Sequence, residues 1–410
     1  MPAPTRSLSL ADVRRFVDEE VFTSREGPPT DGRVGIELEW IVVSRHHDGV
    51  PAPAQLVTLL PTELPGGSRV TFEPGGQLEL SGPVAPTLRD ACQAMRADTA
   101  AVRRAFGPHD LDLVGAGVDT RGDVPRVLDE PRYRAMEEYF DTRWPSGRTM
   151  MRNTASVQVN LDAGNPATVD ARWHLAHDLG PVLTGCFANS PFDRSGAPTG
   201  FRSTRSAVWQ EIDPARTGAA RNGRRGDAPT EWTRYLLDAP VMMIRVDERD
   251  STVPRIPMTF AEWVGDGHSA GWPTLDDLAY HATTLFPPVR PRGWLELRMI
   301  DALPEPWWPV AVGVATALLD DPLAARQASD ATASSRDHWY AAARSALHDP
   351  VLALAAVECF TAARSALERL DADDATRAAT DEYFDRFVAR GRCPADEQLD
   401  EWSRLQAANV

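Results

Sequence analysis

The chain has 410 residues, of which 42% are hydrophobic and 25% charged, and its formal net charge is −16. This is an ordinary globular composition with enough apolar residues for a sizeable core, and the acidic charge argues against a nucleic-acid-binding protein. The sequence contains no lysine, so all 43 basic residues are arginines. A P-loop and a lysine Schiff base are therefore excluded, because both need lysine.

Cysteine usage and apolar runs predict a cytoplasmic chain. The four cysteines, at positions 92, 186, 359 and 393, form no CxxC pair and match no zinc or disulfide framework. The N-terminal segment is charged by residue 12 and lacks the apolar region of a secretory signal. The longest apolar run, 307–319, is too short to span a bilayer, so no membrane partner is expected.

Helices and short strands alternate through the first half of the sequence. Helices are predicted over 9–22 and from Thr87 onward, and strands over 33–40, 111–117, 154–162 and, as a pair around the turn at 74–76, within 68–83. The segments 27–32 and 44–67 are rich in proline and glycine and predict connections.

The second half of the chain becomes helical towards its end. A helix over 167–187 is expected to break or kink at Gly180-Pro181, and 196–230 is predicted to be a long loop. Further elements are predicted as a helix over 274–285, a last strand over 292–301 and helices over 312–328, 335–347, 350–370 and 374–390. With no internal repeat, this order predicts an α+β fold.

Polar residues recur on one face of four predicted strands. Because side chains alternate along a strand, the following sets share a face: Glu37 with Glu39, Gln77 with Glu79, Ser156 with Gln158 and Asn160, and Glu296 with Arg298. For each strand alone, a water-facing surface of an antiparallel sheet is the simpler interpretation. The whole set is almost entirely carboxylates and carboxamides, which are ligands for hard cations.

A cluster of four carboxylates on adjacent strands would repel strongly without cations among them. Mg²⁺ prefers carboxylates, water and substrate phosphates in octahedral geometry. The pattern therefore predicts that these glutamates bind Mg²⁺, and that the metal's partner is a nucleoside triphosphate.

Several motifs occur in an order that resembles a known family. They are VGIELEW, FEPGGQLELSGP, ASVQVNLD, GFRSTRSAVWQEIDPARTG, ATTLFPPVRPR, RGWLELRMIDALP and ARGRCPAD. Together they resemble the glutamate–cysteine ligases of the plant and actinobacterial type, over nearly the whole chain. EPGG alone is a weak signal, whereas the motifs in register are a strong one.

The resemblance implies a single domain, 1–410, with a sheet-containing core over 1–305 and a helical region over 306–410. It implies a glutamine-synthetase-like, curved, mainly antiparallel sheet that forms an acidic funnel backed by helices. It also implies ATP-dependent joining of the γ-carboxylate of L-glutamate to the amine of L-cysteine through a γ-glutamyl phosphate, for ergothioneine biosynthesis. A different amine acceptor on the same fold is the alternative.

The resemblance also implies roles for individual residues. Metal ligands are expected among Glu37, Glu39, Glu73, Glu79, Gln158 and Glu296, substrate contacts from Arg205, Trp209 and Asn160, and nucleotide contacts from Arg298 and Gln77. Arg298, with Glu296, is the candidate for stabilising the transferred phosphoryl group, and Arg205 for binding the α-carboxylate of glutamate. Without the family match, Arg205 would be a surface residue of an arginine-rich loop and Trp209 a core residue.

Two other interpretations remain open at the level of sequence. The arginines at 216, 221, 224 and 225 belong either to a solvated flexible loop or to a cover over ATP. A metal-dependent hydrolase would use the same carboxylates to activate water, and a binding protein would take up ligand without phosphate release. Omitting ATP, Mg²⁺, glutamate and cysteine in turn from an assay separates these classes.

Overall fold

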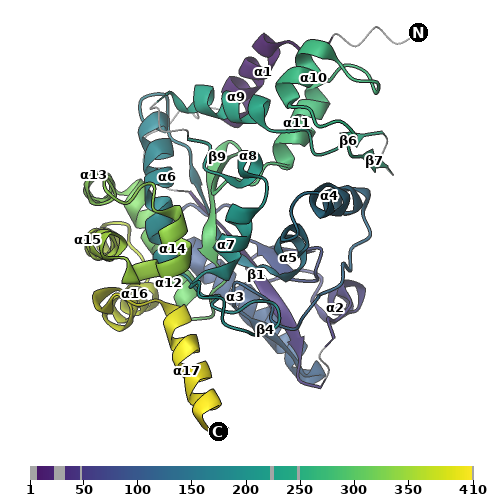
Figure 1. The fold of residues 1–410 in the computed structure, drawn as a ribbon. Coiled ribbons are helices and arrows are strands. Elements are labelled where there is room, and N and C mark those ends of the chain that lie inside the picture. Colours follow the sequence, from purple (N-terminus) through teal and green to yellow (C-terminus); the bar gives the residue numbers. More distant parts are fainter. Residues whose placement is uncertain (1–6, 23–32, 47–48, 222–225, 247–249, 409–410) are drawn as a thin grey trace.

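A computed structural model describes residues 7–22, 33–46, 49–221, 226–246 and 250–408 (Figure 1). The strands are β1 Val34–Ser44, β2 Arg69–Phe72, β3 Leu78–Ser81, β4 Leu111–Val114, β5 Ser156–Asp162, β6 Ile244–Arg245, β7 Ser251–Thr252, β8 Val289–Pro291 and β9 Trp294–Asp301. The helices of the first 300 residues are α1 Leu10–Phe16, α2 Pro53–Leu59, α3 Leu88–Phe106, α4 Pro131–Asp141, α5 Gly147–Asn153, α6 Val169–Cys186, α7 Thr204–Glu211, α8 Pro214–Thr217, α9 Ala228–Asp238, α10 Phe260–Asp266 and α11 Leu275–Thr283. The C-terminal helices are α12 Trp307–Asp320, α13 Pro322–Ala331, α14 Trp339–Ser345, α15 Pro350–Arg369, α16 Asp374–Arg386 and α17 Pro394–Ala408.

An antiparallel sheet forms the centre of the molecule. Its strands follow the order β2-β3-β1-β5-β9-β8, and β4 pairs with the second half of β1. The long strand β1 pairs with β3 and β5 through its first half, so segments far apart in the sequence meet along it. The observed sheet confirms the prediction of a mixed fold with a mainly antiparallel sheet.

One face of the sheet is apolar and is covered by helices. Ile36, Leu38 and Trp40 of β1 are almost fully buried, and so are Val159 of β5 and Leu297 of β9. Helices α3, α6 and α12 contact this part of the sheet, and the other C-terminal helices lie beyond α12 and α6 (Figure 1). Alternation of apolar side chains thus places every intervening polar residue on the opposite face.

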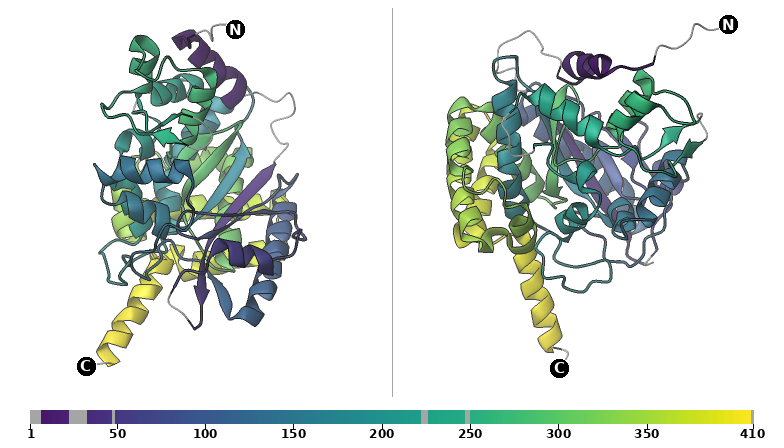
Figure 2. Two further views of the ribbon diagram at one scale, coloured as in Figure 1. Left: turned by 90° about the vertical axis from the view of Figure 1, so that its right-hand side faces the viewer. Right: turned by 45° about the horizontal axis from the view of Figure 1, so that its top comes forward.

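A second, smaller hydrophobic cluster lies over the opposite face of the sheet. It joins residues of α4, α5 and α7 with the segment before β6, and its members include Met136, Met150, Met151, Met242 and Met243. The two turned views show α4 and α5 on the side of the sheet away from the C-terminal helices, whereas α9 packs against α6 (Figure 2).

The C-terminal helices pack mainly on one another. Among the described residues, α15 is the one helix long and apolar enough to cross a membrane, and half of its apolar stretch is buried. It contacts α12, α13 and α16, as a core helix does. Helix α17 runs away from the body, and its second half is exposed (Figures 1 and 2).

Most predicted elements are confirmed, and the caps explain where two helices begin. Ser9 caps α1 through a reciprocal pair of bonds with Asp12, and Thr87 caps α3. The strands predicted around the turn at 74–76 are β2 and β3. The loop predicted at 27–32 lies outside the described residues.

Two predictions about the middle of the chain need correction. Helix α6 continues through Pro181 without the expected break, because its buried surface on the sheet and on α14 outweighs the lost backbone hydrogen bond. The segment 196–230 is not one long loop, since it contains α7, α8 and the start of α9. Its polar, arginine-rich composition concealed a capped helix, which begins at the Ser203 cap and buries Ala207 and Val208.

Candidate active site

A cavity of about 300 Å³ lies between the polar face of the sheet and the smaller hydrophobic cluster. Its acidic lining residues are Glu37, Glu39, Glu73, Glu79 and Glu296, and its basic ones are Arg69, Arg132, Arg205, Arg290, Arg292 and Arg298. Gln158, Ser156, Thr154 and Ser81 line it from the sheet side, and Tyr133, Met136, Met150, Met151, Trp209 and Phe286 are among those on the other. A volume of this size is at the lower end of the range for small-molecule sites.

Strand register brings the acidic residues together. Glu39 of β1 stands directly opposite Glu79 of β3, and Glu37 stands opposite Gln158 of β5. Because each pair of directly opposed residues points to the same side of an antiparallel sheet, all four face the cavity. Glu73 follows β2 and is held by its backbone N–H, which donates to the carbonyl of Gln77 (2.9 Å).

An irregularity in β9 begins at Arg298 and changes the direction of the residues after it. Val157 pairs with Ile300 and Val159 pairs with Leu297, so two residues of β9 oppose the single residue Gln158. Such a bulge shifts the alternation along the strand by one residue. Ile300 therefore returns to the apolar face, while Arg298 remains in the cavity.

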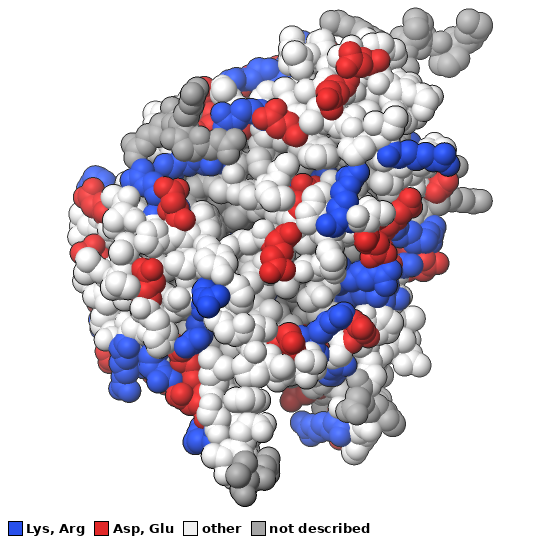
Figure 3. All heavy atoms as spheres, viewed as in Figure 1, with Lys and Arg blue, Asp and Glu red and all other residues white. Residues whose placement is uncertain are grey.

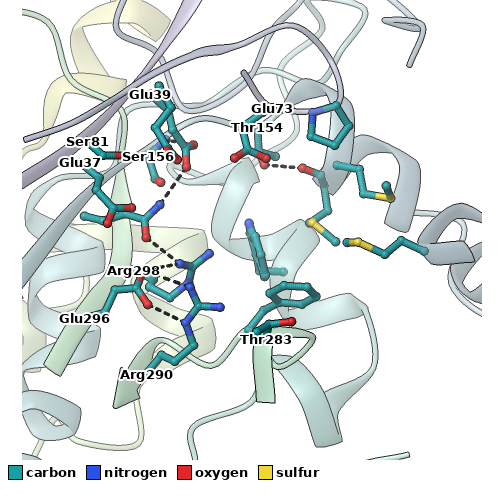
Figure 4. A pocket seen from close by; sticks show the side chains of 18 of the residues that line it. Glu37, Glu39, Glu73, Ser81, Thr154, Ser156, Thr283, Arg290, Glu296 and Arg298 are labelled. Carbon is teal, nitrogen blue, oxygen red and sulfur yellow. Dashed lines mark hydrogen bonds and ion pairs between the residues drawn. The ribbon is translucent and has the colours of Figure 1, made fainter. Parts of the chain in front are cut away.

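Three carboxylates are placed as a metal-binding group. Glu39, Glu73 and Glu79 each offer one oxygen, and these oxygens all lie within 4.8 Å of one another. Figure 4 shows Glu39 and Glu73 directed into the same space. Thr71 and Ser81 donate hydroxyl hydrogen bonds to Oε1 of Glu79, at 2.7 and 2.9 Å. Oxygen-only donors with supporting hydrogen bonds fit a hard divalent cation.

The pKa values of the clustered carboxyl groups are raised by burial and by their mutual repulsion. Burial, followed by the charges of Glu296 and Glu79, raises the pKa of Glu37 to about 7. Burial and the charge of Glu79 raise the pKa of Glu39, and burial with Glu39 and Glu79 raises the pKa of Glu73 strongly. A cation among these carboxylates would reverse each shift, since an opposite charge favours the ionised form.

Glu296 has a different environment from the other acids. Arg290 donates to both of its oxygens (2.6 and 3.1 Å), and Nη1 of Arg298 donates to Oε1 at 3.0 Å and to Oε1 of Gln158 at 2.6 Å (Figure 4). Burial raises the pKa of Glu296, but these two arginines outweigh it and lower the pKa to about 2. Glu296 is therefore an ionised partner of arginines in this structure, although it was expected among the metal ligands.

Arg205 and Trp209 lie one helical turn apart on α7 and both line the cavity. Arg205 is 4% exposed; its Nη2 donates to the carbonyl of Arg298 at 2.8 Å, and its Nη1 lies 3.8 Å from Oδ1 of Asp301. Asp301 accepts hydrogen bonds from the hydroxyls of Ser190 and Ser203. The carboxylate of Asp301 is thus held in place and orients the guanidinium of Arg205. Sequence reasoning did not identify Asp301 as a site residue.

Two expected site residues do not reach the cavity wall. Gln77 is buried, and its amide donates to the carbonyl of Thr154 (2.8 Å), so it holds the link between α5 and β5 beside the turn at 74–76. Asn160 donates to Oε1 of Glu37 (3.1 Å) and accepts from the indole of Trp294 (3.1 Å). Its contact with the site is therefore through Glu37.

The sequence interpretation of the arginines after α7 is wrong where the structure describes them. Arg216 is fully buried and donates to Asp213 and to Thr284, and Arg221 pairs with Asp178. Both fix the fold and neither lines the cavity. Residues 224 and 225 lie outside the described residues. Arg290 is a site residue that the sequence analysis did not name. It stands opposite Glu296 in the hairpin of β8 and β9, and this pairing is the signal that could have indicated it.

Two solved structures of other proteins are similar to the chain in fold. A bifunctional glutathione synthetase from Pasteurella multocida has a TM-score of 0.54 at 16% identity, covering 89% of this chain and 49% of that one. A glutamate–cysteine ligase from Francisella tularensis, in complex with AMP, has a TM-score of 0.53 at 13% identity, covering 90% of this chain and 84% of that one. The chain therefore shares its fold with these two enzymes.

The model of glutamate–cysteine ligase family 2 matches residues 33–408, and the chain belongs to this family of enzymes. Glutamate–cysteine ligase EgtA of Mycolicibacterium smegmatis is 41% identical over 389 residues, which is 90% of either chain. EgtA of Mycobacterium tuberculosis (strain H37Rv) is 41% identical over 385 residues, 88% of this chain and 87% of that one. The chloroplastic enzyme of Nicotiana tabacum is 32% identical over 254 residues, 58% of this chain and 46% of that one.

Proposed function

We propose that the protein joins the γ-carboxylate of L-glutamate to the amine of L-cysteine with cleavage of ATP to ADP and phosphate. One observation carries the proposal: three half-buried carboxylates with converging oxygens share a cavity with Arg298 and Arg205. The likeness to EgtA over 90% of both chains supports glutamate and cysteine as substrates and ergothioneine biosynthesis as the destination of the product. A cytoplasmic location stays a prediction.

The residues fit a divalent cation, and we propose Mg²⁺. Glu39, Glu73 and Glu79 would hold it, with Glu37 as a further oxygen donor at the same face. When bound, the ion neutralises phosphate charge and polarises the transferred phosphoryl group. In a chain without lysine, the remaining positive charge must come from arginine.

Arg298 is proposed to face the phosphoryl group and the oxyanion formed when the amine attacks. Glu296 and Gln158 fix its guanidinium, so little reorganisation is needed during the reaction. Arg205, oriented by Asp301 and lying 5.8 Å from the ring of Trp209, is proposed to bind the α-carboxylate of glutamate. Each residue thus has a charge and a fixed direction that suit its role.

Formation of ADP measured with ATP, Mg²⁺, glutamate and cysteine, each omitted in turn, tests the proposed function. We expect ADP only in the complete mixture, or slowly without cysteine, and γ-glutamylcysteine as product. A panel of other amines tests the acceptor. Equal rates for all of them would mean that the enzyme accepts a broader class of amines than cysteine. Turnover without ATP would instead establish a hydrolase.

A further inference from the structure

The arginines that line the cavity fall into two groups. Arg290 and Arg298 pair with Glu296, and Arg205 is directed by Asp301. The others are Arg69, Arg132 and Arg292. Within the described part of the chain, none of these three pairs with a carboxylate, so their charge is available to an anionic ligand.

Arg132 bridges two sides of the cavity. It is the second residue of α4, and its guanidinium donates to Oγ1 (2.8 Å) and to the carbonyl oxygen (2.7 Å) of Thr283, the last residue of α11. It also lies 5.5 Å from the ring of Tyr280. All these partners are neutral, so the contacts hold the side chain without neutralising it.

Charge and position both indicate that Arg132 serves a ligand. A cation in the first turn of a helix opposes the helix dipole; the acid at the start of α4 is its N-cap Glu130, and the guanidinium of Arg132 donates to Thr283 instead. Arg134, in the same turn, pairs with Asp129, whereas Arg132 does not. The first turn of α4 also faces the acidic group, because Arg132 and Tyr133 line the same cavity as Glu73 and Glu79.

We propose that Arg132 leaves Thr283 and binds the phosphate groups of the nucleotide, together with Arg69 and Arg292. The inference rests on the proposed function, which makes a nucleoside triphosphate a substrate of this cavity. Guanidinium groups form paired hydrogen bonds with phosphate oxygens, and this chain has no lysine to do so. Arg292 lies 5.6 Å from the ring of Trp294, so the ring holds it at the cavity without taking its charge.

The Arg132→Gln variant is compared with Arg134→Gln, which removes a neighbouring charge outside the cavity. We expect the Arg132 change to raise KM for ATP about 10- to 100-fold, the range for a lost charged hydrogen bond, and to leave KM for glutamate within about twofold. The Arg134 variant should match the wild type. Calorimetric titration with Mg²⁺–ATP, and with inorganic triphosphate, should show the same loss without turnover. Thermal unfolding checks that both variants fold.

A third variant separates ligand binding from a purely structural bridge. Thr283→Ala removes one acceptor of Arg132 but keeps the guanidinium, so KM for ATP should stay unchanged or fall. If Thr283→Ala raises KM for ATP as Arg132→Gln does, the bridge itself matters and the proposal is overturned. A rise in KM for glutamate alone would assign Arg132 to a substrate carboxylate and also overturn it. If the wild type binds triphosphate but forms no ADP, the proposed function fails while the inference stands.

Discussion

Glu39 and Glu79 face each other directly across β1 and β3, and their carboxylates point into the same cavity. Like charges at directly opposed positions of an antiparallel pair are destabilising. Here the backbone N–H of Ser156 and the amide of Gln158 donate to the two oxygens of Glu39, at 2.8 and 2.9 Å. These bonds hold the carboxylate of Glu39 beside Glu79 in spite of the repulsion between the two charges. A fold that keeps such a pair has a use for the charge, which is the basis of the proposed metal site.

Glu79→Gln should therefore separate stability from function. Removing one of the three charges relieves repulsion, so the melting temperature of the metal-free protein should stay equal or rise. Affinity for Mn²⁺, measured by calorimetry, should fall at least about tenfold, and kcat should fall on the order of 10²–10³-fold. The control is Glu401→Gln, an exposed position on α17. Unchanged Mn²⁺ affinity in Glu79→Gln would remove this residue from the metal site.

Arg290→Met tests the buried charge network around Glu296. Breaking a buried ion pair by removing one partner typically costs about 3–5 kcal/mol. Because Glu296 keeps Arg298 at 3.0 Å, we expect a loss near the lower limit, about 3 kcal/mol, in urea unfolding. The double variant Arg290→Met/Glu296→Gln should recover part of the loss, since the buried carboxylate that lost one of its two arginines is then neutral. If the double variant loses as much additional unfolding free energy as Glu296→Gln loses alone, the two residues are not coupled.

Much of this arrangement could be predicted from the sequence because it depends on alternation. Two-residue periodicity places Glu37, Glu39 and Glu79 on one side of their strands. Pairing of those strands then brings the three carboxylates to the same face of the sheet. The same reasoning fails at Gln77, which lies next to the turn outside β3 and turns its amide to the backbone of Thr154. Periodicity holds within a strand and carries no information beyond its end.

Contacts between distant elements were beyond this reasoning. Arg132 and Thr283 are 151 positions apart, and no local pattern relates α4 to α11. The bulge in β9, which turns Ile300 to the apolar face, was not predictable either, because no glycine or proline marks it within the strand. The surface is equally uninformative about the site, since arginines and acids are mixed over the visible face (Figure 3).

Gly75→Ala is expected to displace the turn that carries Glu73. A Cβ atom at position 75 would lie 1.9 Å from the backbone oxygen of Arg152, and a backbone atom cannot move aside cheaply. We expect a clear fall in melting temperature and loss of Mn²⁺ affinity together. The matched control is Gly107→Ala, at the C-cap of α3, where a Cβ atom meets nothing within 4 Å. Wild-type behaviour of Gly75→Ala would contradict the close approach of the turn to α5.

Two buried histidines should make the protein sensitive to mild acid. Burial lowers the pKa of His281 to about 3 and the pKa of His177 to about 4, and each ring nitrogen contacts a backbone carbonyl. Both remain neutral in the folded protein while they are protonated below about pH 6.5 in the unfolded chain. Their stabilising contribution is therefore complete above pH 6.5 and is lost progressively as the pH falls toward 4 and 3.

At pH 5 this linkage amounts to about 2 kcal/mol for each histidine, or about 4 kcal/mol together, because each pH unit below 6.5 costs about 1.4 kcal/mol per group. Urea unfolding at pH 7.5 and pH 5 measures the difference. His281→Gln keeps an N–H donor for the carbonyl of Leu236 and does not titrate, so it should lower stability at pH 7.5 but remove about half of the pH dependence. His109→Gln, at an exposed position, should leave the dependence as in the wild type. An unchanged slope in His281→Gln would mean that His281 is already accessible to protons in the folded protein.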